Sequence, residues 1–167
     1  MHERIESRSS EQMDIPNRNA SFTIDASSPD IDLAKKKLAA EALSVVIVKH
    51  GKAMFTSRAP GVRSLIDAIR EFGPSLAGAS VADKVVGKAA ALLCVYAKAS
   101  RVYGCVMSEL GSEVLKRFSV PFEHETLVPN ILDRHGTGMC PFEKLVLMIN
   151  SPEEAFSAIN RHLATRA

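Results

Sequence analysis

One segment constrains the fold of this chain more than any other: residues 82–93, ADKVVGKAAALL. Together with the apolar residues that follow, it predicts a helix with hardly any polar face, for which Asp83 supplies the N-cap. A helix that is apolar on most sides must be covered by other elements on those sides. We therefore expect a layered protein in which this helix is buried.

Two lysines stand at the start of the predicted helix. Lys84 and Lys88 are four residues apart, on one side of the helix, and Gly87 leaves an opening beside them. A cation in the first turn opposes the positive end of the helix dipole, typically by a few tenths of a kcal/mol, so a bound anion or a buried carboxylate would explain the pair. The alternative, in which Asp83 only caps the helix and both lysines point into water, explains the sequence equally well.

Length and composition suit one globular domain. The chain has 167 residues, of which 46% are hydrophobic, and this is enough to fill a core without metal or disulfide staples. Residues 1–30 are rich in polar and charged side chains and show no regular apolar period. We expect a flexible N-terminal tail there and a single domain over residues 31–167.

The same composition argues against several partners. The net charge is only +2 and Trp is absent, so neither a phosphate-tracking surface nor base-stacking platforms are indicated, and a nucleic-acid partner is not expected. No apolar run is long enough to span a membrane. Three cysteines without a CxxC pair indicate free thiols, which suits the cytoplasm.

Hydrophobic periodicity predicts strands and helices that alternate along the chain. The expected elements are a helix capped by Asp30, a strand at 43–49, a tight turn at His50-Gly51, a strand at 53–56, a helix at 62–72, a strand at 79–82, the central helix, a strand at 102–107, a helix capped by Ser108, a strand at 121–125, a helix at 142–149 and a last helix begun by a capping box at 151–154. The hairpin is antiparallel, whereas the strand, helix and strand from 79 to 107 form a parallel βαβ unit. This order predicts an α/β fold with a mixed sheet.

A long polar segment, residues 129–140, interrupts the regular pattern. Loops of this length inside a compact domain are commonly functional or disordered. Cys140 ends the loop at the N-cap of the next helix, where the dipole favours a thiolate, so it is the strongest candidate for a nucleophile. Glu143 opposes the thiolate, and the alternative of Cys140 as a partly buried cap residue stays open.

Familiar nucleotide and metal motifs are missing. Gly87-Lys88 resembles the end of a P-loop, but the first glycine and the Mg²⁺-binding hydroxyl of that motif are absent, which argues against nucleotide hydrolysis by that route. His124, His135 and Cys140 gather along the chain without the spacing of zinc ligands. We expect no metal and no cofactor.

Three segments resemble an uncharacterised bacterial and archaeal domain family. They are residues 44–49 (SVVIVK), 81–93 (VADKVVGKAAALL) and 136–146 (GTGMCPFEKLV). The resemblance implies a cytidine-deaminase-like fold, a three-layer α/β/α sandwich, from residue 43 to about residue 158. Deaminases hold zinc at the start of the helix after the hairpin and at the start of the next helix, and the corresponding places here, 58–63 and 83–88, contain no His or Cys. The resemblance therefore implies a zinc-free fold without deaminase chemistry.

These observations lead to a hypothesis about a ligand site. The site would bind a small anionic or nucleotide-like molecule between two sets of residues, Asp83, Lys84, Gly87 and Lys88 on one side and Asn130, Arg134, Thr137 and Cys140 on the other. In an enzyme, Cys140 would be the nucleophile, Lys84 or Lys88 would hold negative charge, and Asp83 would orient a lysine. The sequence leaves open whether the protein is an enzyme. The competing interpretation is a non-catalytic scaffold that associates through its sheet edge or helices, and a homo-oligomer fits either interpretation.

Overall fold

The computed structural model describes residues 28–166, so most of the predicted tail lies outside the described residues. The helices are α1 (Pro29–Ala40), α2 (Arg63–Phe72), the 3-10 helix η1 (Gly73–Leu76), α3 (Lys88–Tyr96), α4 (Glu109–Arg117), α5 (Pro141–Leu145) and α6 (Pro152–Ala164). The strands are β1 (Val45–Lys49), β2 (Lys52–Ser57), β3 (Ser80–Val86), β4 (Arg101–Ser108) and β5 (Phe122–Val128). None of the helices in this described part is long and apolar enough to cross a bilayer.

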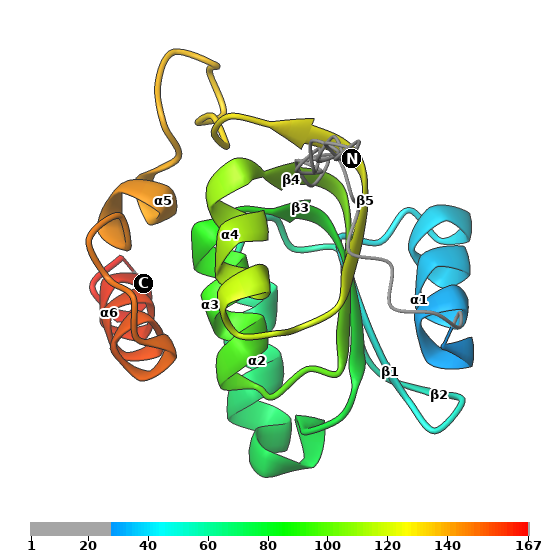
Figure 1. Ribbon diagram of the computed structural model, residues 1–167. Coiled ribbons are helices and arrows are strands. Elements are labelled where there is room, and N and C mark those ends of the chain that lie inside the picture. Colours follow the sequence, from blue (N-terminus) through cyan, green and yellow to red (C-terminus); the bar gives the residue numbers. More distant parts are fainter. Residues whose placement is uncertain (1–27, 167) are drawn as a thin grey trace, which may run out of the picture.

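The strands form one five-stranded mixed sheet in the order β2-β1-β3-β4-β5. The hairpin β1–β2 and the pair β1–β3 are antiparallel, whereas β3–β4 and β4–β5 are parallel. Figure 1 shows this sheet edge-on, with helices on both sides of it. The α/β class and the mixed sheet predicted from the sequence are confirmed.

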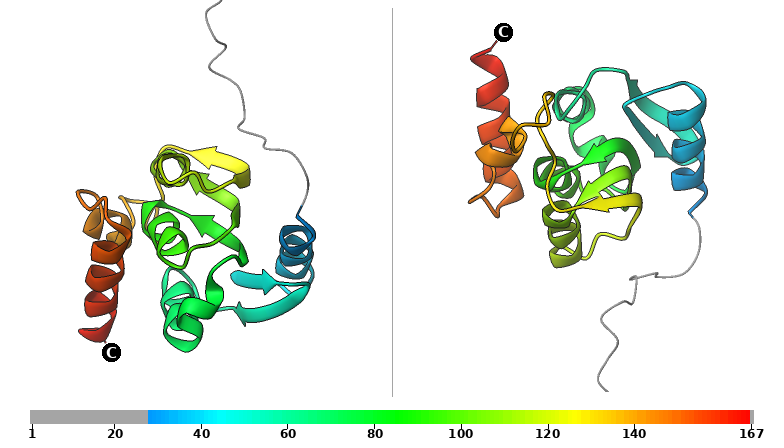
Figure 2. Two further views of the ribbon diagram at one scale, coloured as in Figure 1. Left: turned by 60° about the horizontal axis from the view of Figure 1, so that its bottom comes forward. Right: turned by 90° about the horizontal axis from the view of Figure 1, so that it is seen from above.

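Each face of the sheet has its own apolar core. Strand β1 shows why, since Val45 and Ile47 pack in the larger cluster with α2 and α3, while Val46 and Val48 pack in the smaller cluster under α1. Because side chains alternate along a strand, a strand covered on both faces is apolar at every position. The helices α5 and α6 add an outer layer beside α3 (Figure 2).

Helix α3 lies between the sheet and this outer layer. Its first seven residues are buried, and its neighbours are α4 on one side and α6 on another. The three consecutive alanines at 89–91 are almost completely inaccessible to solvent. The expectation that this helix is covered on most sides is confirmed.

Two predicted boundaries near α3 and α5 are wrong. Strand β3 continues to Val86, where Val85 and Val86 pair with Val106 and Met107 of β4, and the helix begins only after Gly87. Asp83 is therefore inside the strand and caps nothing. Val85 and Val86 extend the strand because they pair with β4. Hydrophobic periodicity within the sequence does not reveal such a pairing. Helix α5 is also shorter than predicted and ends at Leu145.

The start of α1 also differs from the prediction. Ser28 occupies the N-cap position and Pro29 begins the helix, so Asp30 lies in the first turn. The Asp30 carboxylate instead accepts hydrogen bonds from the backbone N–H groups of His50, at 2.9 Å, and Gly51, at 2.7 Å. Both turn residues have positive φ angles, as the predicted tight hairpin requires. One carboxylate thus fastens the hairpin to α1.

We expect Asp30→Ala to lower the free energy of unfolding by about 1–2 kcal/mol, because two backbone donors of the hairpin turn lose their acceptor. Chemical denaturation followed by circular dichroism measures this change. Asp32→Ala, which removes a carboxylate from the same helical turn, is the control and should cost less. Equal losses for the two variants would contradict the role assigned to Asp30.

Candidate functional site

The N-terminus of α3 is closed by a carboxylate from a distant part of the chain. Glu143, in α5, is 3% exposed, and its two oxygens accept the backbone N–H groups of Lys88, at 2.9 Å, and Ala89, at 3.0 Å. A negative charge at this position satisfies two free donors and the positive end of the helix dipole. This is the buried carboxylate that the lysine pattern suggested as one of two explanations. The end of α3 therefore has no free donors at these two positions for an external anion.

Two glycines make room for this arrangement. A Cβ atom added to Gly87 would lie 2.4 Å from Oε1 of Glu143, and one added to Gly111 would lie 2.7 Å from the carbonyl oxygen of Val86. Both distances are far below van der Waals contact. Gly87 thus serves the approach of Glu143, and the opening predicted beside it is filled by that side chain.

Lys88 is buried, and its ammonium group faces the chain that links α5 to α6. It donates to the carbonyl oxygen of Leu147 at 2.7 Å and to Oδ1 of Asn150 at 3.4 Å. Arg117 of α4 donates to the same Oδ1 at 3.1 Å. Burial, followed by the nearby charge of Arg117, lowers the pKa of Lys88. Lys88 therefore ties α3 to the C-terminal segment and is already engaged by protein acceptors.

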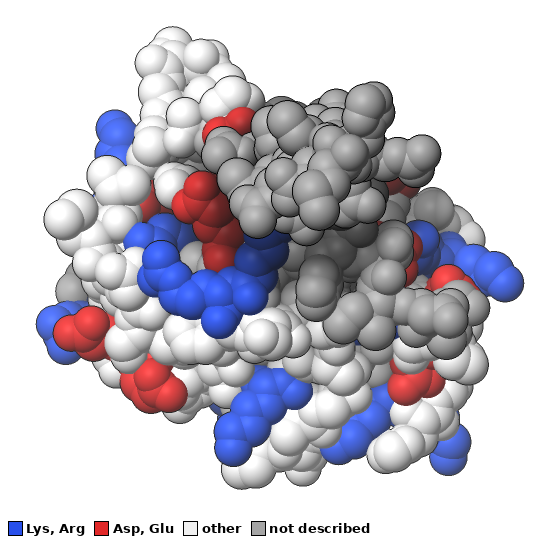
Figure 3. Space-filling model, in the orientation of Figure 1, with Lys and Arg blue, Asp and Glu red and all other residues white. Residues whose placement is uncertain are grey.

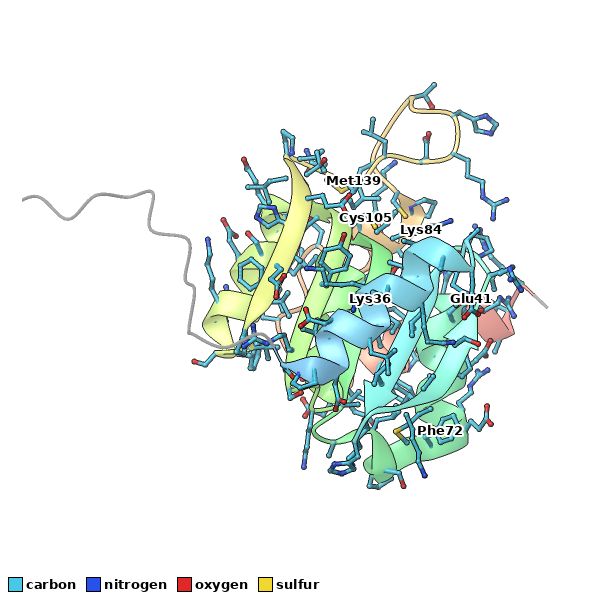
Figure 4. The ribbon with its side chains drawn as sticks, turned by 90° about the vertical axis from the view of Figure 1, so that its right-hand side faces the viewer. Lys36, Glu41, Phe72, Lys84, Cys105 and Met139 are labelled. Carbon is cyan, nitrogen blue, oxygen red and sulfur yellow. The ribbon has the colours of Figure 1, made fainter. Side chains whose placement is uncertain are left out.

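Lys84 lies on the opposite face of the sheet. Ala82, two residues earlier in β3, packs under α1, and side chains two apart in a strand share a face. Figure 4 shows Lys84 on this α1 side, near the end of that helix, and the side chain is exposed. The prediction that Lys84 and Lys88 stand on one side of a helix is wrong, because the first lysine belongs to a strand.

Asp83 is buried in β3. Its Oδ1 accepts the backbone N–H of Val85 at 3.0 Å, and burial raises the pKa of its carboxyl from 3.8 to about 7. Cys94 of α3 is also fully buried; burial, together with the charge of Asp83, raises the pKa of the Cys94 thiol far above its ordinary value. Asp83 and Cys94 are therefore both part of the buried interior.

A cleft of about 700 Å³ opens where the loop after β5 meets the rest of the domain. Its walls come from the turn before α2, the end of β3, the loop, the start of α5 and the residues after α6. The lining residues are Pro60, Gly61, Val85, Ile131, Leu132, Asp133, Arg134, His135, Cys140, Pro141, Phe142 and Arg166. Figure 1 shows this loop above α5 at the top of the molecule.

The loop has an ordered internal structure built around Asp133. Its carboxylate accepts the backbone N–H groups of His135, at 3.0 Å, and Thr137, at 3.1 Å, and also the Thr137 hydroxyl at 3.1 Å. These bonds, led by the one from the Thr137 backbone, lower the pKa of Asp133. Cys140 donates its N–H to the carbonyl oxygen of Ile131 at 2.9 Å, which closes the loop. Residues 131–140 thus form a compact unit that presents Arg134 and Cys140 to the cleft.

The structure brings together only part of the predicted site. Cys140 and Arg134 line the cleft. The other predicted residues lie outside its walls; they are Asp83, Lys84, Gly87, Lys88, Asn130 and Thr137. The cleft also includes four residues that were not among the predicted site residues, namely Pro60, Gly61, Val85 and Arg166. They come from segments far apart along the chain, so only the folded structure joins them.

The polar groups of the cleft are one thiol, two guanidinium groups, the His135 imidazole and the Asp133 carboxylate. Cys140 is half-buried, is a free thiol and occupies the N-cap position of α5, without a capping bond from its side chain. Helix α5 has only five residues, so its dipole is weaker than that of the longer helix predicted from the sequence. Among residues 28–166, no group of three or more His, Cys, Asp and Glu side chains is arranged to hold a metal ion.

Sequence comparison connects this architecture to a known family. The sequence model of TM1506, described as a domain of unknown function (DUF1893), matches residues 33–163. The chain belongs to this family. The matched range contains every helix and strand except the start of α1 and the last residue of α6.

A DUF1893 family protein of known structure has a similar fold. The crystal structure of TM1506 from Thermotoga maritima is 28% identical in sequence to this chain and superposes with a TM-score of 0.76. The similarity covers 83% of this chain and 92% of that one. No functionally curated protein matches the sequence significantly.

We expect Glu143→Gln to lower the free energy of unfolding by about 1–3 kcal/mol, because a neutral amide keeps only one acceptor for the two N–H groups of α3. Thermal and chemical denaturation measure the change. Glu113→Gln, in the exposed face of α4, is the matched control and should have little effect. Equal stability of both variants would contradict the capping role of Glu143.

Asp83 should make the stability depend on pH. Because its pKa rises from 3.8 to about 7 on folding, the folded protein keeps this proton at pH values where the unfolded chain has lost it. The resulting stabilisation is fully present below pH 3.8 and is lost as the pH rises to about 7. Asp83→Asn should remove this decline and be more stable than the native protein near neutral pH, by up to about 4 kcal/mol at ~1.4 kcal/mol for each pKa unit.

Denaturation of the native protein and of Asp83→Asn between pH 4 and pH 8 tests this expectation. The partly exposed Asp67→Asn is the control and should keep the pH dependence of the native protein. Parallel stability curves for the native protein and Asp83→Asn would contradict it.

Proposed function

We propose that this DUF1893 domain binds a small anionic, nucleotide-like molecule in the cleft at Cys140. The single observation that carries the proposal is that apolar side chains, two arginines and one free thiol line the same cleft. The apolar side chains of Val85, Ile131, Leu132 and Phe142 can cover a planar or aliphatic body. Pockets of this kind, mostly apolar with a few polar groups, are typical of small-molecule sites.

The cations of the cleft suit a phosphate or carboxylate. These cations are Arg134 and Arg166, and both side chains are exposed. A guanidinium group can bind two anionic oxygens at once, which favours a phosphate or a carboxylate over a neutral ligand. In this proposal Arg134 and Arg166 take the role that the sequence suggested for Lys84 and Lys88.

The position of the cleft supports a zinc-free cytidine-deaminase-like fold, which is part of the proposal. The resemblance assigns the zinc ligands of deaminases to two regions of this chain, 58–63 and 83–88. Pro60 and Gly61 of the first region and Val85 of the second lie in the wall of the cleft. None of these residues is a metal ligand, so the proposed ligand would occupy a deaminase-like pocket without the hydroxide that zinc supplies.

Cys140 is the residue we assign to direct contact with the ligand. It is the only cysteine among residues 28–166 that lines the cleft. A thiol can act as a nucleophile once it is deprotonated. We no longer assign Lys88 and Asp83 a catalytic role, because their side chains form hydrogen bonds within the protein.

The competing function is a non-catalytic scaffold. Two observations favour it. The Lys88 ammonium group is bound by the Leu147 carbonyl oxygen, and the Glu143 carboxylate binds the N-terminus of α3, so Lys88 and Glu143 both have structural roles. A scaffold predicts no change in stability with small anions.

We also propose a reducing compartment such as the cytoplasm. All three cysteines are free, and Cys140 lies open to a cleft. A free thiol at a site of contact with a ligand is best preserved where glutathione keeps thiols reduced.

Ligand binding should raise the melting temperature of the native protein. At a ligand concentration 100 times the dissociation constant, the stabilisation is ~2.7 kcal/mol. We expect this shift from at least one nucleotide or sugar phosphate in a thermal-shift screen. Arg134→Ala should lower the affinity about tenfold and therefore reduce the shift. Lys36→Ala, which removes an exposed cation from α1, should leave the shift unchanged.

Protection of Cys140 from iodoacetamide provides the second readout. The stabilising compound should slow the labelling of Cys140, as measured by mass spectrometry. A compound that stabilises Arg134→Ala and the native protein equally, or that leaves labelling unchanged, would place its site elsewhere. If no anion in the screen stabilises the native protein, the scaffold interpretation stands.

A further inference from the structure

Strand β5 forms an edge of the sheet without the lysine, proline or bulge that often protects such an edge. It pairs with β4 on one side, and within residues 28–166 no strand pairs with its other side. The opposite edge, β2, begins with Lys52 and pairs with β1 through an irregular register. Bulges and lysines discourage pairing with another chain. The seven residues of β5, FEHETLV, contain no Pro and no Lys, and their register with β4 shows no shift.

The free backbone groups of β5 can be identified from its register. Val102 of β4 donates its N–H to the carbonyl oxygen of Pro121 at 3.0 Å, so Pro121 and every second residue after it face β4. The N–H and C=O groups of the alternate residues therefore point away from the sheet; these residues are Phe122, His124, Thr126 and Val128. Four residues with outward donors and acceptors are enough for a regular pair of strands.

Helix α4, which packs beside β5, carries a self-complementary pattern of charges. Glu109 and Glu113 are exposed in its first half, and Lys116 is exposed at its end beside Arg117, which also binds Asn150. Figure 3 shows acidic side chains above basic ones over the part of the surface where α4 lies. Two such helices that run antiparallel would bring the acidic half of each to the basic half of the other.

We propose that β5 pairs antiparallel with β5 of a second copy of this chain. A two-fold axis perpendicular to the sheet relates the copies and joins their sheets into one of ten strands, five from each copy. The same axis places the two α4 helices side by side and antiparallel. The charge pattern of α4 selects this occupant, because the surface that complements it is the same surface of another copy.

The glutamates of β5 determine the register. An axis at Glu123 or Glu125 would set identical carboxylates opposite each other, and an axis at His124 would set Glu123 opposite Glu125. An axis at Thr126 avoids each of these contacts and still pairs most of the strand. It sets Thr126 opposite the partner's Thr126 and Glu125 opposite the partner's Leu127.

The proposed register also covers apolar surface. Leu127 is 46% exposed, and the axis at Thr126 brings the two copies of Leu127 into diagonal contact across the new strand pair. His124 faces the partner's Val128 on the side of the sheet that carries α4. The second copy therefore covers the exposed apolar side chain of β5 as well as its backbone.

Thr126→Pro tests the interface without disturbing the rest of the sheet. The N–H of Thr126 points away from β4, so proline there removes a donor from the new strand pair while the β4–β5 ladder is retained. Light scattering after size-exclusion chromatography should show a dimer for the native full chain and a monomer for Thr126→Pro. Thr126→Val keeps the donor and should remain dimeric, and circular dichroism verifies the fold of each variant.

Two further variants test the helices and the register. Lys116→Glu should weaken the dimer at least tenfold, and the double variant Glu113→Lys with Lys116→Glu should restore it. With Cys105→Ser and Cys140→Ser in the background, Thr126→Cys should form a disulfide-linked dimer on oxidation, because opposite residues of a hydrogen-bonded pair are close enough for a disulfide. Glu125→Cys should not. A monomeric native protein, or a dimer that Thr126→Pro leaves intact, would overturn the proposal, and linkage through Glu125→Cys alone would overturn the register.

Discussion

The rest of the structure depends on two hydrogen bonds, in which the Glu143 carboxylate accepts the first two N–H groups of α3. Helix α3 is covered by the sheet, by α4 and by α6, so water cannot satisfy the donors at its buried start. A buried N–H group without an acceptor destabilises the fold by about as much as a lost hydrogen bond. Several such groups at one helix end would therefore destabilise the fold strongly. The carboxylate supplies this partner and fixes the distance between α3 and α5. Gly87 is required because a Cβ at this position would collide with the Glu143 carboxylate.

The order of elements could be predicted from the sequence because each signal is local. The apolar run of α3, the turn at His50-Gly51 and the cap at Ser108 depend on neighbouring residues, and the Ser108 hydroxyl indeed accepts the N–H of Gly111 at 3.0 Å. The end of β3 could not be predicted in the same way. Val85 and Val86 fit either a strand or the first turn of a helix, and only their pairing with β4 decides between them.

The candidate site was predictable in part, for the same reason. Cys140 and Arg134 stand out within one polar loop, and the loop indeed carries them to the cleft. The cap formed by Glu143 joins residues 55 positions apart, and no local pattern signals such a contact. The two lysines were misplaced because one shift of the helix start moved Lys84 to the other face of the sheet. A boundary error of a few residues therefore changes the chemistry assigned to a site far more than it changes the fold.

The long sequence separation between α3 and its covering has a consequence for how the chain is made. Glu143, Leu147 and Asn150, which hold the start of α3, and α6, which covers its side, all lie more than fifty residues further along the chain. During synthesis from the N-terminus, the most apolar helix therefore leaves the ribosome well before the segment that shields it. During that interval residues 88–96 expose apolar surface, and such surface makes an incompletely folded chain prone to aggregation.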